Sequence, residues 1–115
     1  MNDSTNLEHL LQHMHPVLNP GTFVFATAPA ETALARSDVI ASIREREGLS
    51  VVVEESVALR ARLVPQFRCA WITLTVHSAL QAVGLTAAFS AALGEVGISC
   101  NVVAGVFHDH LFVPV

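Results

Sequence analysis

The chain has 115 residues, of which 52% are hydrophobic and 14% charged, with a formal net charge of −4. This composition excludes a disordered chain, and the length is that of one domain with a single core. All six basic residues are arginines, and they form no patch that could follow a phosphate backbone, so nucleic-acid binding is disfavoured.

The aliphatic content is high for so small a domain, which favours either a subunit interface or a covering segment outside these residues, and we expect a homodimer. Cys69 and Cys100 lie in apolar segments, and their spacing fits neither a metal-binding pair nor a disulfide framework. No apolar run approaches the ~18 residues of a membrane span, and the N-terminus lacks the pattern of a signal peptide. We therefore expect a cytoplasmic protein that does not cross a membrane.

The first half of the chain predicts a short helix that ends at Pro16, followed by two strands. The strands are expected at 21–28 and 49–54, where β-branched and aromatic residues are dense. Residues 30–47 between them are alanine-rich, then charged, and give no clear pattern. A brief helical segment is expected at 57–63.

The second half gives a clearer pattern. Residues 67–76 are apolar on both faces, as in a central strand. Apolar side chains recur at helical spacing through 84–96, and Gly97 follows where a left-handed cap is needed. Two further strands are expected, at 98–104 and 110–115, with a short turn between them.

This order predicts that strands 67–76 and 98–104 pair in parallel through a right-handed helical crossover. The resulting βαββ unit is the front part of a ferredoxin-like sandwich. We expect an α+β fold of this kind with additional N-terminal strands, an antiparallel or mixed sheet, and helices on one face. An N-terminal half, 1–66, and the βαββ unit, 67–115, would together form one compact domain.

The run VGLTAAFSAALGEVGISCNVVAG, residues 83–105, resembles the ACT domain, the small-molecule-sensing module of amino-acid metabolism. Gly84 and Leu85 match the pair that opens the helix in that family. With the flanking WITLTV and HDHLFVP, residues 67–115 are similar to a bacterial group of small stand-alone ACT proteins, and residues 17–54 resemble that group less closely. The resemblance implies a C-terminal helix that this unit lacks, and Val83 stands where many ACT proteins have proline.

The resemblance also implies a regulatory, non-enzymatic domain that binds an amino acid at the loop before the helix and at a subunit interface. Free N–H groups in the first helical turn suit a carboxylate, and Gly84 lets a ligand approach the backbone. Ser99 matches a position that contacts ligand in some ACT regulators, and alternation along the strand places Asn101 on the same face. The predicted ligand-binding residues are His77, Val83, Gly84, Leu85, Ser99 and Asn101.

Two other interpretations remain open. The same fold is compatible with a homodimeric assembly module that binds no ligand. A small metal-dependent enzyme would use His77, His108 and His110 as zinc ligands. The turn expected at His108-Asp109-His110 would point the two imidazoles apart, so no metal or other cofactor is expected.

Overall fold

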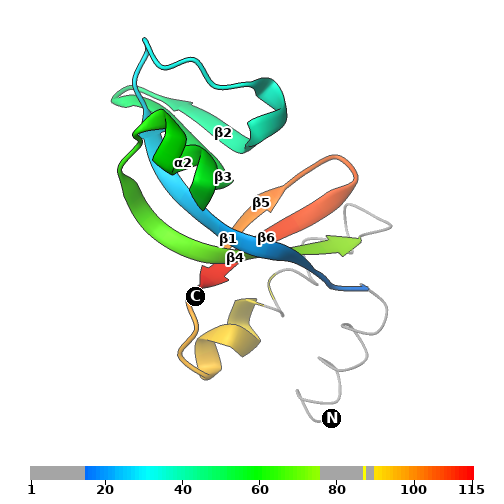
Figure 1. Cartoon of the computed structure of the whole chain (residues 1–115). Coiled ribbons are helices and arrows are strands. Elements are labelled where there is room, and N and C mark those ends of the chain that lie inside the picture. Colours follow the sequence, from blue (N-terminus) through cyan, green and yellow to red (C-terminus); the bar gives the residue numbers. More distant parts are fainter. Residues whose placement is uncertain (1–14, 76–86, 88–89) are drawn as a thin grey trace, which may run out of the picture. The chain divides into compact units, whose positions relative to one another are not determined.

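A computed structural model describes residues 15–75, 87 and 90–115 of the chain (Figure 1). Strands dominate the described residues. The labelled elements are β1 (Val17–Ala28), η1 (Arg36–Asp38), β2 (Val39–Glu45), β3 (Gly48–Glu54), α2 (Glu55–Ala61), β4 (Pro65–Thr75), β5 (Asn101–Ala104) and β6 (His108–Pro114). The strands predicted at 21–28 and 49–54 are confirmed as parts of β1 and β3.

The hydrogen-bonded strands follow the order β2-β3-β1-β4-β6-β5. Antiparallel pairing joins β2 to β3, β3 to β1, and β5 to β6. The described residues form two compact units, of which the first comprises those up to Asn19 and those from Trp71 to Pro114, and the second comprises Pro20–Ala70 and Val115. Both β1 and β4 contribute residues to each unit, and the predicted boundary after residue 66 stays a prediction.

The predicted ferredoxin-like fold class, with its βαββ unit and helices on one face, is wrong. That unit was expected to place strands 67–76 and 98–104 side by side and parallel, whereas β6 lies between β4 and β5. Among the described residues, helix is confined to η1, α2, and positions 87 and 90–95. The short β5–β6 hairpin explains the strand order, because β6 folds back antiparallel on β5 and its other edge then pairs with β4.

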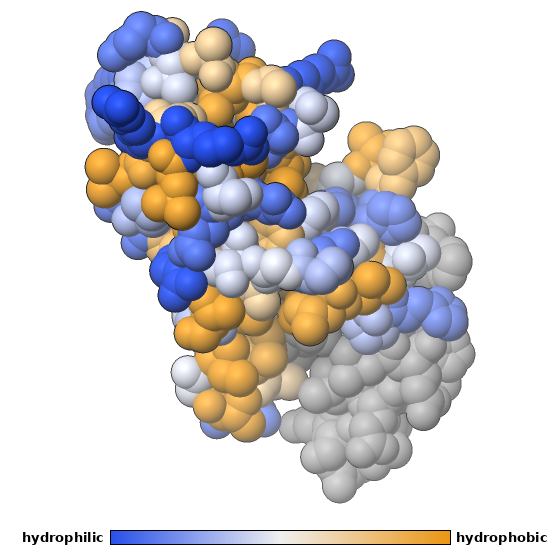
Figure 2. All heavy atoms as spheres, viewed as in Figure 1, coloured by the Kyte–Doolittle hydropathy of each residue, from blue (hydrophilic) through white to orange (hydrophobic). Residues whose placement is uncertain are grey.

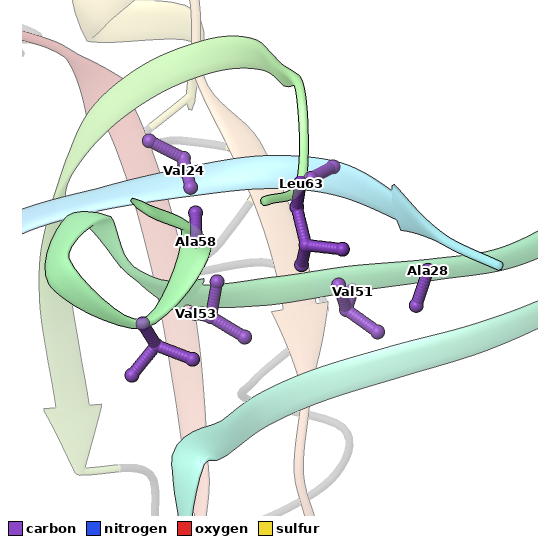
Figure 3. Close-up of a cluster of buried hydrophobic side chains, with 8 residues drawn as sticks. Val24, Ala28, Val51, Val53, Ala58 and Leu63 are labelled. Carbon is purple, nitrogen blue, oxygen red and sulfur yellow. The ribbon is translucent and has the colours of Figure 1, made fainter. Parts of the chain in front are cut away.

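The core of the second unit lies between α2 and one face of β1 and β3 (Figure 3). Val24 of β1 pairs in register with Val53 of β3, and both are fully buried against α2, where Ala58 is also fully buried. Each valine removed from water contributes roughly 1.5–3 kcal/mol, so this face holds the short helix in place. The eight buried residues of the cluster are Val24, Ala26, Ala28, Val51, Val53, Val57, Ala58 and Leu63.

The ambiguous residues 30–47 contain a strand that the sequence did not reveal. β2 is an edge strand joined to β3 by a two-residue turn, since Glu45 pairs with Gly48. Gly48 has φ +149°, and a Cβ there would lie 3.2 Å from Cγ2 of Thr27. The position therefore favours glycine for both its conformation and its close packing.

The helix predicted over 84–96 is helical at 87 and 90–95, and its other opening residues lie outside the described ones. Gly97 has φ +77°, as expected of a left-handed cap. Its N–H donates to Gly94 O at 3.0 Å, and Ile98 N–H donates to Leu93 O at 2.9 Å. These bonds end the helix and satisfy its last carbonyls.

Large apolar side chains remain exposed on several elements, as the high aliphatic content led us to expect (Figure 2). The most exposed are Val106, at 94%, and Phe107, at 78%, in the turn between β5 and β6. None of the described helices is long and apolar enough to cross a membrane.

Candidate functional site

The predicted ligand-binding residues are only partly within the described structure. His77, Val83, Gly84 and Leu85 lie outside the described residues. Ser99 is exposed and precedes β5, while Asn101 is exposed and opens that strand. Asn101 lies opposite Phe112, and Val103 opposite His110, in the antiparallel β5–β6 pair. Directly paired residues share a face, so Asn101 projects on the same side as His110 and Phe112.

A set of hydrogen-bonded polar and aromatic side chains lies on this face of the first unit. Side chains alternate along a strand, so Trp71, Thr73 and Thr75 project to one side of β4. They contact side chains that project to one side of β6. We call this set the polar face; its members are Asn19, Trp71, Thr73, Thr75, His108 and His110.

Asn19 connects the start of β1 to the end of β4. Its Nδ2 donates to Thr73 Oγ1 at 2.9 Å and to the Trp71 carbonyl oxygen at 3.2 Å. Both protons of one amide group are thereby used between two neighbouring strands. Asn19 therefore fixes the backbone at Trp71 from the side opposite to β6.

Trp71 lies against two residues of β6. Its Nε1–H donates to Nδ1 of His110 at 3.0 Å, and the two ring centroids are 5.8 Å apart. The indole also stacks on Phe112, with centroids 6.4 Å apart and an interplanar angle of 21°. Phe112 is fully buried, so the indole rests on a ring that is itself held by packing.

His108 and His110 lie within β6, and the turn predicted for them is wrong. The turn occupies 105–107 instead, and Gly105 N–H donates to His108 O at 2.8 Å. The two imidazoles therefore share one face of the strand, with centroids 6.4 Å apart and planes at 80°. Nδ1 of His108 lies 3.4 Å from the Thr75 hydroxyl.

Burial lowers the pKa of His110, and the neighbouring His108 lowers it further, while Asp109 acts in the opposite direction. Asp109 is buried and alternates with the two histidines, so it projects to the other face of β6. The polar face is therefore an environment in which His110 is neutral near pH 7.

No described cluster of three or more histidine, cysteine, aspartate or glutamate side chains is arranged to hold a metal ion. The ligand set of His77, His108 and His110 extends beyond the described residues, so the metalloenzyme interpretation stays a hypothesis. The expected turn would have pointed the two imidazoles apart, whereas the structure places His108 and His110 on one face of β6.

A cavity of about 330 Å³ lies elsewhere, in the second unit, at the lower end of the size of small-molecule pockets. Its polar lining residues are Thr32, Arg36 and Ser42. The lining residues are Ala28, Pro29, Ala30, Thr32, Leu34, Arg36, Val39, Ser42 and Leu49. None of them belongs to the predicted ligand-binding set.

Comparison with known families decides the identity of the chain. One family model of the ACT domain matches residues 3–70, and a second matches residues 66–115. The chain belongs to the ACT-domain family. The resemblance stated for the second half and for residues 17–54 is thus confirmed. Membership in the ACT family suggests a regulatory role through small-molecule binding.

Two solved structures are similar to this chain. A crystallised Vibrio cholerae protein of unknown function, described as a possible transport protein, is 47% identical; the match covers 98% of this chain and 88% of that chain, with a TM-score of 0.73. An Agrobacterium tumefaciens protein shares 20% identity over 86% of this chain and 76% of its own, with a TM-score of 0.60, and indicates the fold alone. No curated protein matches this ACT-family chain.

Sequence reasoning missed Asn19, Trp71, Thr73 and Thr75 as members of a site in this ACT protein. A usable signal was present: Trp71, Thr73 and Thr75 recur at every second position of a predicted strand. The partners on β1 and β6 carried no such signal. Asn19 and Thr73 are 54 positions apart, and no local pattern connects residues at that separation.

Proposed function

We propose that this ACT-domain protein binds a small metabolite, an amino acid, and regulates other activities through that binding. The proposed contacts are the predicted ones, in which the loop of His77 and Val83 to Leu85 faces Ser99 and Asn101. The loop and the first turn of the following helix would receive the ligand carboxylate. The oxygens of Ser99 and Asn101 would accept hydrogen bonds from the ammonium group.

The placement of Asn101 carries this proposal. Asn101 was selected by strand alternation alone, and it lies on the same face as His110 and Phe112, opposite the latter. Its side chain is exposed, so its amide is available to a ligand. A polar residue on a strand with this orientation adds hydrogen-bonding capacity to the polar face. Convergent polar groups beside aromatic rings are typical of small-molecule sites.

Regulation would follow from a difference in affinity between two arrangements of subunits. A ligand shifts such an equilibrium only if it binds one arrangement more tightly than the other. The proposed homodimer brings a second copy to the ligand, so that binding changes the association constant of the subunits. No chemical step is required of the protein.

Calorimetric titration with the twenty common amino acids, each to millimolar concentration, tests the proposal. We expect one amino acid or a related group to bind, and Asn101→Ala to weaken that binding by at least tenfold. Val102→Ala is the matched control, because Val102 is the next residue of β5 and projects to the opposite face. Sedimentation with and without the ligand should show a change in association. Silence across the whole panel would contradict the proposal.

The assembly module without a ligand is the second candidate, and the exposed apolar turn favours it. Val106 and Phe107 are almost fully exposed, and adjoining apolar side chains of this kind mark interaction surfaces. Gly84→Trp separates the candidates. A pure assembly module keeps its oligomeric state and has no ligand binding to lose, whereas a sensor loses binding.

A further inference from the structure

The hydrogen bond between Trp71 and His110 has only one possible direction. The indole Nε1–H is a donor and carries no lone pair to accept with, so Nδ1 of His110, 3.0 Å away, must accept. A neutral imidazole whose Nδ1 accepts carries its proton on Nε2. The contact with Trp71 therefore specifies one of the two tautomers of His110.

We infer that Trp71 holds His110 as the neutral Nε2–H tautomer and that this N–H is a donor for a ligand carboxylate on the polar face. The tautomer follows from the geometry of the first unit alone. The carboxylate as its acceptor rests on the proposed function, and His110 would add a side-chain donor to the backbone N–H groups of the loop and helix that would receive the same carboxylate.

The imidazolium form of His110 is disfavoured by the same contact. Protonation would place a second N–H against the indole N–H and break the hydrogen bond. Burial and the nearby His108 act in the same direction, and Asp109 acts against them from the other face of β6. Trp71, the β4 residue that contacts the ring, is not titratable, and Val103 of β5 lies opposite His110.

Gly105 lies close to Nε2 of His110 and has no side chain. A Cβ on Gly105 would lie 3.4 Å from this nitrogen and 3.0 Å from the carbonyl oxygen of His108. Within the described part of the chain, the His110 ring makes its hydrogen bond through Nδ1. His110 is half-buried, so Nε2–H is a directed donor rather than a fully solvated one.

The same tautomer argues against a metal ion at this nitrogen. A metal takes the lone pair of neutral Nε2, which requires the ring proton to move to Nδ1. Nδ1 is occupied as an acceptor from Trp71, so metal binding would have to break that bond. The described geometry thus fits an acceptor oxygen at Nε2 and not a divalent cation.

The tautomer is read directly by ¹H–¹⁵N NMR of the full chain at pH 7.5, with long-range couplings to the histidine ring protons. We expect His110 to show a protonated Nε2 and an unprotonated Nδ1. Trp71→Phe keeps an aromatic ring but removes the donor, so both tautomers should appear and the His110 pKa should rise. A protonated Nδ1 in the unaltered chain would overturn the inference, as would zinc ions displacing the Nε2 proton at stoichiometric concentration.

Acetate is the probe for the ligand, with chloride at equal ionic strength as its control. The NMR signal of the Trp71 indole N–H should shift saturably with acetate. This N–H donates to Nδ1 of the imidazole whose Nε2–H would bind the acetate. In His110→Asn, the amide oxygen can replace Nδ1 as the acceptor from Trp71, but the shorter side chain has no N–H at the position of Nε2. The affinity for acetate should therefore fall at least tenfold. His110→Gln places an amide at the Nε2 position and should retain most of the affinity.

The outcomes separate the two proposals. Equal acetate affinity in the unaltered chain and in both variants would overturn the inference that His110 donates to a carboxylate. The absence of any saturable shift would do the same. The NMR result then decides the tautomer separately. Acetate binding at His110 with a silent amino-acid panel would contradict the proposed function and support the donor. Circular dichroism of each variant confirms that it is folded before its affinity is compared.

Discussion

Asn101 of β5 lies directly opposite Phe112 of β6. This pairing puts an exposed amide over the strand whose buried ring supports Trp71. The position of Trp71 on the polar face therefore depends on the packing of Phe112, and a change at Phe112 should alter the polar face.

Phe112→Ala should destabilise the fold by roughly 3–5 kcal/mol, the usual cost of removing a fully buried phenylalanine. It should also release the indole of Trp71 from its stacked position. Urea denaturation followed by circular dichroism measures the change in the free energy of unfolding. Phe107→Ala is the matched control, because Phe107 is 78% exposed and its loss should cost little. Similar costs for the two variants would contradict the burial of Phe112.

Asn19 and Thr73 should be energetically coupled. Asn19→Ala and Thr73→Val each remove the 2.9 Å hydrogen bond, and we expect each to cost about 1 kcal/mol of stability. The double variant should cost less than the sum, because the second change has no bond left to break. Urea denaturation of all four chains measures the coupling. Strict additivity would show that the bond is absent in solution.

The two cysteines should differ in their rates of alkylation. Cys69 is fully buried, and burial raises its pKa to about 11, so only about 0.1% would be thiolate at pH 8. Burial also raises the pKa of Cys100, although a hydrogen bond with Ser90 lowers it in part. Mass spectrometry after iodoacetamide treatment at pH 8 should therefore find Cys100 labelled first. Cys100→Ala in urea is the control, in which Cys69 should react quickly; equal rates in the folded chain would disprove the burial.

Glu55 and Arg68 should make stability depend on acid pH. Arg68 donates a 2.6 Å hydrogen bond to Glu55, and this bond holds the pKa of Glu55 below its ordinary value. A depressed folded-state pKa stabilises the fold above the unfolded pKa of about 4.3, and the gain is lost as pH falls through the folded value. The urea midpoints of the unaltered chain and Arg68→Gln should thus differ at pH 6 and converge toward pH 3.

Arg46→Gln is the control for that titration. Arg46 and Glu47 are 3.9 Å apart with side chains 93% and 77% exposed, so solvent screens their attraction. No pH-dependent difference from the unaltered chain is expected. A convergence equal to that of Arg68→Gln would mean that general charge removal, and not the bond to Glu55, causes the effect.

Strands were predictable where the chain is apolar on both faces, as at Val51 to Val53. A run of consecutive valines is stable only where both faces of the strand are buried. β2 was missed because it is an edge strand whose Ile43 is 57% exposed and whose next two residues are charged, which resembles a solvated loop. Edge strands bury too little to leave a periodic pattern. The strand order was also out of reach, since the crossover rule assumes neighbours in parallel pairing, whereas the β5–β6 hairpin inserts β6 beside β4.

The site was partly predictable for the same physical reason. Alternation placed Asn101 on a face, and that inference needs only one strand. The turn predicted at His108 to His110 was wrong because Gly105 and the two exposed apolar residues after it make the turn instead. Contacts such as Trp71 with His110 join residues 39 positions apart and depend on strand order, which the sequence did not reveal.

Trp71 is the single tryptophan of a chain that has no tyrosine. Its ring contacts the imidazole of His110 and the buried ring of Phe112, so the tryptophan emission of the chain originates from the polar face. An imidazolium quenches a neighbouring indole, whereas a neutral imidazole quenches it weakly. The protein thus carries its own optical label, and a plain fluorimeter can screen metabolite libraries against it without any dye.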